Sequence, residues 1–244
     1  SFFTEKNKNS SNHLFYNLEK GLDFQYFDQS SLELIIEKTS NDTYLRANKL
    51  ESPIINEYSV LENSFNLNMY SDDFAIDTQF TIYENLDKEK TDRYEYILPE
   101  LNVTKKLDNK TSLDGTFVFN SKNLFKNYDT NVSEKININD LVFNSNPKIS
   151  NNGFYSNYEF IIKNSNSDAN NSGNYKNKEN YYLGALFQYN TSLPLVKENA
   201  EFQNVLSPKI SLKIGPDHTK DKRDSFTRLD VNNIYGLDRL ASDD

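Results

Sequence analysis

The stretch of this 244-residue chain that comes closest to a chemical motif is the polar segment 168–179. Oxygen-bearing side chains occupy its first, third, fifth and twelfth positions, namely Asp168, Asn170, Ser172 and Glu179, and a glycine occupies the sixth. This spacing is that of a calcium-binding EF-hand loop. An EF-hand loop needs a helix on each side, whereas the flanking segments alternate like β-strands. The sequence therefore favours a solvated loop, and we predict no metal site there.

Candidates for catalysis are weaker still. The chain has no cysteine and only two histidines, which excludes a thiolate nucleophile, a disulfide framework and zinc held by His and Cys. His218 lies beside Asp217 and seven residues before Ser225, but all three stand in one polar stretch without an oxyanion-hole pattern. Adjacent carboxylates arise by chance among 36 acidic residues. We expect no enzymatic activity and no cofactor.

The charge balance limits the partners. The chain has 27 basic and 36 acidic residues, a formal net charge of -9. This charge disfavours nucleic acid as a partner, because such binding depends on neutralising phosphates. Hydrophobic residues make up 36% of the chain and aromatic ones, all Phe and Tyr, 14%. Because disordered chains contain few aromatic and β-branched residues, we expect a folded chain with a thin core.

Apolar residues recur at every second position over most of the length, which is the period of a β-strand. A clear example is 209–214, where isoleucine and leucine alternate with lysine and serine. Helical spacing appears only weakly, in Leu229–Leu240. The sequence therefore predicts an all-β chain, with strands near residues 12–26, 31–39, 57–70, 74–86, 94–105, 112–123, 132–144, 153–165, 180–192 and 203–215.

The connections between these strands differ in length: tight ones at 71–73 and about 106–111 alternate with longer polar ones at about 40–56, 87–93, 166–179 and after 216. Outer-membrane barrels, which are antiparallel and up-and-down, have short turns at one end and long loops at the other. Most predicted strands also reach the ~9–11 residues that cross a tilted bilayer, rather than the ~5–6 common in soluble sandwiches. These features favour a transmembrane β-barrel over the alternative, a soluble extracellular β-sandwich that binds glycans or calcium.

Four short stretches add a family resemblance. Residues 39–45 (TSNDTYL) contain Asp42 and Tyr44, and residues 97–101 (ILPEL) contain Pro99. Pro208 lies in 206–210 (LSPKI), and 237–242 (LDRLAS) follows after a polar stretch. In this order they resemble motifs of the LptD family, the lipopolysaccharide-assembly proteins of Gram-negative outer membranes. The first two resemble the family's strand end SD-x-x-Y-hydrophobic and its strand LP-x-hydrophobic. The last two resemble its strand element L-x-P-x-hydrophobic and its loop end LDR-hydrophobic-A-S. Asn41 stands where the family usually has Ser.

The resemblance implies that residues 1–244 are the middle of a larger antiparallel up-and-down barrel, with about ten of its strands. The family's N-terminal periplasmic domain and its first and last barrel strands have no counterpart here. Full-length members lie in the cell outer membrane and hold a lipoprotein plug of the LptE type in the lumen. They receive lipopolysaccharide from periplasmic bridge proteins and release it into the outer leaflet. The implied function is lipopolysaccharide transport, with lipopolysaccharide, the plug and the bridge proteins as partners.

The loop that ends at Leu237, Asp238 and Arg239 is a candidate structural element of such a barrel. An ion pair between Asp238 and Arg239 and their surroundings would anchor the loop inside a polar lumen and fold it into the barrel mouth. In solvent, the same charges would form a salt bridge worth under about 1 kcal/mol. The sequence leaves both interpretations open.

Overall fold

The structure is a computed structural model, and it describes residues 12–48, 57–89, 91–128, 131–199 and 202–215. It confirms the all-β prediction, because eleven strands join in one antiparallel sheet and two more form a separate hairpin. The sheet contains β1 (His13–Leu22), β2 (Gln29–Thr39), β3 (Val60–Tyr70), β4 (Phe74–Asn85), β5 (Tyr94–Leu107), β6 (Gly115–Tyr128), β7 (Val132–Ser145), β8 (Lys148–Ile149), β9 (Tyr155–Asn170), β10 (Asn180–Ser192) and β13 (Lys209–Ile214). The hairpin pairs β11 (Leu195–Glu198) with β12 (Gln203–Leu206).

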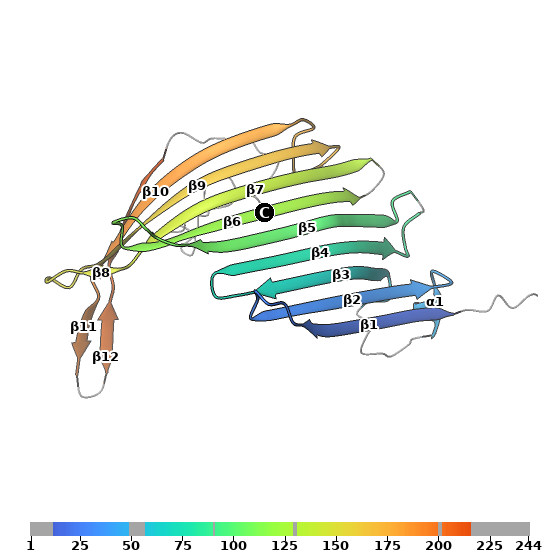
Figure 1. The fold of residues 1–244 in the computed structure, drawn as a ribbon, viewed down its shortest axis with the longest axis horizontal. Coiled ribbons are helices and arrows are strands. Elements are labelled where there is room, and N and C mark those ends of the chain that lie inside the picture. The colour runs from blue at the N-terminus through green and yellow to red at the C-terminus, as the bar shows by residue number, and fades with distance from the viewer. Residues whose placement is uncertain (1–11, 49–56, 90, 129–130, 200–201, 216–244) are drawn as a thin grey trace, which may run out of the picture. The chain divides into compact units, whose positions relative to one another are not determined.

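The order of strands in the sheet follows the order in the chain, as predicted for an up-and-down sheet (Figure 1). It runs from β1 through β7 to β9, β10 and β13, and the short β8 pairs with β9. β1 and β13 stand at the two ends of this order, and no pairing joins them within the residues that the structure describes. The described sheet is therefore open.

The strands are as long as the sequence indicated. Nine of them have 10 to 16 residues, from β1 with 10 to β9 with 16. Strands in globular proteins most often have about 5–6 residues. Each long strand can therefore present five or more side chains on either side of the sheet.

The chain divides into two compact units. The first comprises Ser1–Ser71, Ile76–Leu101 and Leu124–Ser133, and the second comprises Asp72–Ala75, Asn102–Asn123 and Glu134–Asp244. In the first unit, Leu45, Leu61 and Leu86 form a small buried core against which Phe15 and Tyr44 pack. In the second unit, the buried apolar side chains are on β7, β9 and β10, namely Ile136, Ile138, Phe143, Ile161, Ala169 and Tyr182. Both cores are thin, as the composition predicted.

A short helix, α1 (Tyr44–Asn48), supplies Leu45 to the core of the first unit. The turn before it is closed by Asn41, whose Oδ1 accepts a hydrogen bond from the Thr43 backbone N–H at 2.9 Å. The sequence pattern does not predict this helix, because five residues are too few to show helical periodicity. The stretch that resembles a strand end at 39–45 therefore contains only one strand residue, Thr39, followed by a turn and the start of α1.

Two details of the predicted connectivity are wrong. The predicted strand 203–215 is two strands, because β12 pairs with β11 whereas β13 pairs with β10. The break falls at Pro208, which has no N–H to donate to a continuous ladder. The tight turn predicted at 71–73 is confirmed between β3 and β4. The long loops predicted for the other end are not uniform, because only three residues separate β6 from β7 there.

Candidate functional site

The two sides of the sheet differ in chemistry, and the first unit shows this on its first three strands. Leu18 lies opposite Leu34, which lies opposite Phe65. Their side of the sheet, the apolar face of the first unit, also carries Leu14, Tyr16, Leu32, Ile36 and Leu67. Leu14 is 55% exposed, and Tyr16 is exposed as well. This face therefore presents large apolar side chains outward, together with Lys20 and Lys38, which lie opposite Leu32 and Leu14.

The opposite side of the same strands is polar. Glu19 lies opposite Glu33, which lies opposite Asn66. Asn66 Nδ2 donates a hydrogen bond to Glu33 Oε2 at 3.0 Å. The backbone N–H of Glu62 donates to Glu37 Oε2 at 2.7 Å, and the Tyr70 hydroxyl donates to Asp77 on β4. We call this side the polar face of the first unit.

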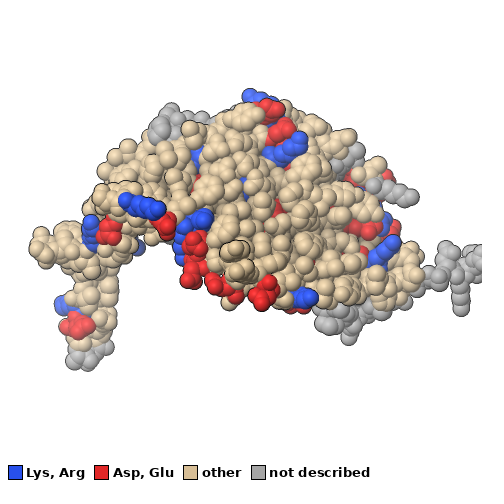
Figure 2. All heavy atoms as spheres, viewed as in Figure 1, with Lys and Arg blue, Asp and Glu red and all other residues tan. Residues whose placement is uncertain are grey.

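The second unit repeats the pattern on β9, β10 and β13. Its apolar face carries Tyr158, Phe160 and Ile162 on β9, Tyr181, Leu183, Ala185, Phe187 and Tyr189 on β10, and Ile210, Leu212 and Ile214 on β13. Leu183 and Ile210 are both 70% exposed. The predicted alternation along 209–214 is confirmed, since the lysines and Ser211 pair with Ser192, Gln188 and Asn190 on the other side. In Figure 2 the surface over β7, β9 and β10 is largely uncharged.

The polar face of the second unit contains polar groups that are more buried than the apolar ones opposite. Gln188 is 0% exposed and Lys163 is 7% exposed. The Lys163 ammonium lies 3.2 Å from the Asp140 carboxylate, in an ion pair between β9 and β7. Large apolar side chains are thus exposed on one face. The other face buries Ile161 and Tyr182 together with amide and charged groups. Contiguous exposed apolar surface of this kind marks a contact with a partner or a membrane.

A set of hydrogen-bonded asparagines interrupts the apolar face of the second unit on β6, β7 and β9. Asn166 Nδ2 donates to Asn164 Oδ1 at 2.7 Å and to Asn137 Oδ1 at 3.1 Å. Asn139 Nδ2 donates to Asn137 Oδ1 at 2.8 Å, and Asn137 in turn donates to Asn123 at 2.5 Å. We call these five residues the amide cluster. On β9 it begins immediately after the apolar residue Ile162, so the face changes from apolar to polar within two positions.

Tyrosines also mark strand ends. In the first unit the Tyr94 and Tyr96 rings at the start of β5 stack with centroids 6.0 Å apart, and both are exposed. The Tyr94 hydroxyl donates to Glu84 Oε1 at 3.1 Å. Tyrosine is enriched at membrane–water interfaces, where its hydroxyl meets polar groups.

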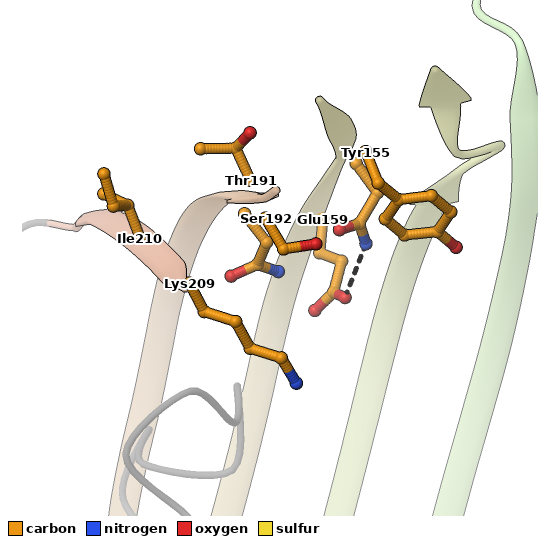
Figure 3. A pocket seen from close by; sticks show the side chains of 8 residues that line it. Tyr155, Glu159, Thr191, Ser192, Lys209 and Ile210 are labelled. Atoms are coloured by element: carbon orange, nitrogen blue, oxygen red, sulfur yellow. Dashed lines mark hydrogen bonds between the residues drawn. The ribbon is translucent and has the colours of Figure 1, made fainter. Parts of the chain in front are cut away.

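A pocket of about 250 Å³ opens on the polar face of the second unit, where β9, β10 and β13 meet. Figure 3 shows Glu159 and Lys209 pointing to one side of the strands, and Thr191 and Ile210 pointing to the other. Asn157 Nδ2 donates to Glu159 Oε1 at 3.1 Å. The pocket therefore offers amide, carboxylate and ammonium groups. The charged side chains and Ile210 lie on opposite sides of the strands in Figure 3, as the strand register also places them.

No protein-family model and no curated protein sequence matches this chain. Within the described ranges, none of the helical segments has the length and apolar character needed to cross a bilayer. The described residues also contain no cluster of three or more His, Cys, Asp or Glu side chains placed to hold a metal ion.

Asp42 and Tyr44, two of the motif positions, lie in the segment 40–48 near the strand ends of the first unit. We call this segment, together with its contact to Arg93, the latch. Arg93, just before β5, binds the Asp42 carboxylate with two nitrogens, at 2.6 and 3.0 Å, and its Nε lies 2.6 Å from Glu84 Oε1. These partners, Asp42 first, raise the pKa of Arg93 further above its ordinary value. Tyr44 packs on the core and its hydroxyl lies 3.0 Å from His13 Nδ1. The sequence analysis missed Arg93, although arginine occurs only five times in the chain.

We predict that Asp42→Ala loosens the 40–48 segment, because it removes the two-nitrogen contact with Arg93. Trypsin cleavage after Arg46 should become about fivefold faster, the factor that corresponds to about 1 kcal/mol for a partly exposed pair. The measurement is the rate of appearance of the fragment ending at Arg46. Asp108→Ala, in an exposed connection, is the control. Equal cleavage rates in the wild type and Asp42→Ala would show that the latch does not hold the segment.

The segment 168–179, whose spacing resembles a calcium-binding loop, does not form an EF-hand, because strands rather than helices flank it. β9 extends to Asn170, so Asp168 and Asn170 lie in a strand. The candidate ligands contact different partners: Asp168 pairs with Lys135 at 3.5 Å, and Glu179 accepts a hydrogen bond from the Tyr181 hydroxyl at 2.9 Å. The Ser172 hydroxyl, which is buried, lies 2.5 Å from Glu134 Oε1. The segment is therefore the end of β9 and its connection to β10, rather than a loop between two helices.

We predict that millimolar calcium leaves the melting temperature of the protein unchanged, because Asp168, Ser172 and Glu179 contact three different side chains. Thermal unfolding followed with and without calcium provides the measurement, with Asp168→Ala as the comparison. A calcium-dependent rise in melting temperature that disappears in Asp168→Ala would contradict the prediction.

The other predicted positions are less informative. Pro99 lies within β5 in the first unit, as the LP-x resemblance indicated, whereas Pro208 falls between β12 and β13 in the second. Leu237, Asp238 and Arg239 lie outside the described residues, as do His218, Ser225 and the weakly helical Leu229–Leu240.

Proposed function

We propose that this chain forms part of the wall of an outer-membrane β-barrel that transports lipopolysaccharide, and that it has no enzymatic activity of its own. The observation that carries the proposal is the set of exposed apolar side chains on one face of the second unit. Its exposed face is apolar, with Leu183 and Ile210 70% exposed, whereas Gln188 and Lys163 are buried on the other face. The apolar faces would contact lipid and the polar faces would line the barrel interior.

Lipid gives these exposed side chains an energetic role. Full burial of a Leu, Ile or Phe side chain contributes about 1.5–3 kcal/mol relative to exposure in water. The apolar face of the second unit has seven such residues and therefore favours transfer out of water. The polar face contains the Asp140–Lys163 ion pair, which needs polar surroundings to stay charged. Placing lipid on one side and a hydrated interior on the other satisfies both faces.

The transport function is supported by the sequence motifs and by the latch. Asp42 belongs to one of the four stretches that resemble the LptD family, and its carboxylate holds the 40–48 segment through Arg93. An ordered segment at one of these stretches is consistent with a barrel in which the connections between strands take part in function. The proposed partners are lipopolysaccharide, a lipoprotein plug of the LptE type in the interior, and periplasmic proteins that deliver the lipid.

A soluble β-sandwich would need a second sheet over the apolar face. Within the residues that the structure describes, the strands outside the main sheet are the four-residue β11 and β12. Two four-residue strands are too small to cover faces built from strands of 10 to 16 residues. We therefore expect the full-length protein to require detergent or lipid to remain dispersed, whereas the sandwich would be soluble without either.

The test of the membrane assignment compares two neighbouring residues on β13. Leu212 lies on the apolar face opposite Tyr189, and Ser211 lies on the polar face opposite Asn190. In the full-length protein in vesicles, a fluorophore on Leu212→Cys should be quenched by lipid-borne quenchers. The thiol of Ser211→Cys should react with a small aqueous reagent. A label at 212 that is shielded from lipid quenchers would show that the apolar face is covered by protein.

The transport assignment needs its own measurement. Depletion of the full-length protein from its bacterium should lower the amount of lipopolysaccharide exposed at the cell surface, while synthesis of the lipid continues. Restoring the wild-type protein should reverse the loss. Unchanged surface lipopolysaccharide during depletion would leave the barrel assignment standing but would contradict the transport function.

A further inference from the structure

Five carboxylates gather on the polar face of the first unit, across β1 to β4. They are Glu19, Glu33, Glu37, Glu62 and Asp77, which we call the acidic stripe. Four neighbouring strands at about 4.8 Å spacing give the stripe a width of about 14 Å. None of the five takes part in an ion pair with Lys or Arg among the described residues.

The register places like charges together. Glu19 and Glu33 are directly opposite each other on β1 and β2. On the next pair of strands, the backbone N–H of Glu62 donates to the Glu37 carboxylate, so that these two residues are also neighbours. Like charges directly opposite each other on paired strands are destabilising. The bare stripe is thus unfavourable to the fold, and a bound positive charge would relieve the repulsion.

Hydrogen-bond acceptors without donors lie in the same stripe. Ser64 stands on β3 between Glu62 and Asn66, on the polar face, and it is 3% exposed. Its hydroxyl oxygen has no hydrogen-bond partner, and neither has Asn66 Oδ1. The Asn66 amide nitrogen is already used by Glu33. A buried acceptor without a donor is costly, so the stripe lacks donors as well as positive charge.

We propose that the acidic stripe binds the arginine and lysine side chains of a basic protein segment. This inference rests on the proposed function, which assigns the polar face to the barrel interior and therefore to a partner lodged there. Arginine carries a positive charge and five N–H donors but no acceptor, which matches carboxylates beside unpartnered oxygens. An extended basic segment also suits a stripe that spans four strands.

A divalent cation fits this surface less well than a basic segment. Among the described residues, no three carboxylates lie close enough together to form a metal site. The stripe distributes its charges across separate strands, so a single ion would neutralise only part of it. Several cationic side chains along one segment can meet several carboxylates at once.

The test uses the full-length protein in detergent and a fluorescent hexa-arginine peptide, with binding followed by anisotropy. The stripe variant carries Glu33→Gln, Glu62→Gln and Asp77→Asn. The matched control carries Asp72→Asn, Glu89→Gln and Asp108→Asn, which remove the same charge from exposed connections. We expect the stripe variant to bind the peptide about tenfold more weakly than the wild type. The control should stay within about twofold, because it changes net charge but not the stripe.

Equal weakening in the two triple variants would mean that the peptide senses only net charge, and would overturn the proposal. A magnesium-dependent rise in melting temperature that the stripe variant loses, without selective peptide binding, would assign the stripe to a divalent cation instead. Circular dichroism of both variants confirms that the comparison is made on folded protein. Lipid quenching at position 212 is measured separately, so failure of the membrane assignment and failure of the basic partner are distinguished.

Discussion

Asp140→Ala should lower the free energy of unfolding by about 3–5 kcal/mol, the usual cost of breaking a buried ion pair. The substitution leaves the Lys163 ammonium, on a residue that is 7% exposed, without a carboxylate that now lies 3.2 Å away. A buried charge without its partner costs more free energy than replacing both charged residues by neutral ones. Denaturant unfolding of the full-length protein in lipid vesicles provides the measurement.

The control for this prediction removes both charges. Asp140→Asn combined with Lys163→Met should recover most of the lost stability, because replacing a buried pair by neutral groups is often close to neutral. A loss below about 1 kcal/mol in Asp140→Ala would place the pair in the class of solvent-screened surface ion pairs. In that case the polar face would be far more hydrated than its burial indicates.

Phe187→Lys should cost about 2–4 kcal/mol of folding free energy in a bilayer if the apolar face contacts lipid near its midplane. Phe187 lies between Phe160 on β9 and Ile214 on β13, so its neighbours on both sides are apolar. A lysine there would have to carry its charge into hydrocarbon. The measurement is the folding equilibrium of the full-length protein in vesicles.

Asn190→Lys is the matched control on the same strand. Asn190 lines the pocket on the polar face together with Glu159, so the new ammonium would meet water and a carboxylate. We expect a change within about 0.5 kcal/mol, typical of surface substitutions. Similar costs for the two lysines would contradict the assignment of opposite environments to the two faces.

The fold was predictable to the extent that it depends on period-two alternation. That pattern located the long strands, and it correctly placed Ile210, Leu212 and Ile214 on the side opposite Lys209 and Lys213. It could not locate α1, which is stabilised by Leu45 in the core and by the Asn41 turn. Nor could it divide 203–215, because alternation continues in phase through Pro208 and gives no sign of a change of partner strand.

The candidate site was less predictable for a similar reason. Asp42 was noticed through its motif, but its partner Arg93 lies 51 positions away in sequence, and no local pattern links the two. The calcium-loop spacing did not identify an EF-hand, because an EF-hand loop needs a helix on each side, whereas β9 extends through Asp168 and Asn170 and pairs with β10. The acidic stripe appears only once the register is known, since Glu19 and Glu33 meet through strand pairing.

The amide cluster has a consequence for how uniquely the strands can align. A strand that alternates regularly can slide by two residues and still keep every side chain on its proper side of the sheet. Along β9 and β7, such a slip would leave the apolar residues well placed but would separate Asn166 from Asn137 and Lys163 from Asp140. The asparagines and the ion pair therefore fix the register of β9 against β7. They favour one alignment among several that the hydrophobic pattern alone would allow.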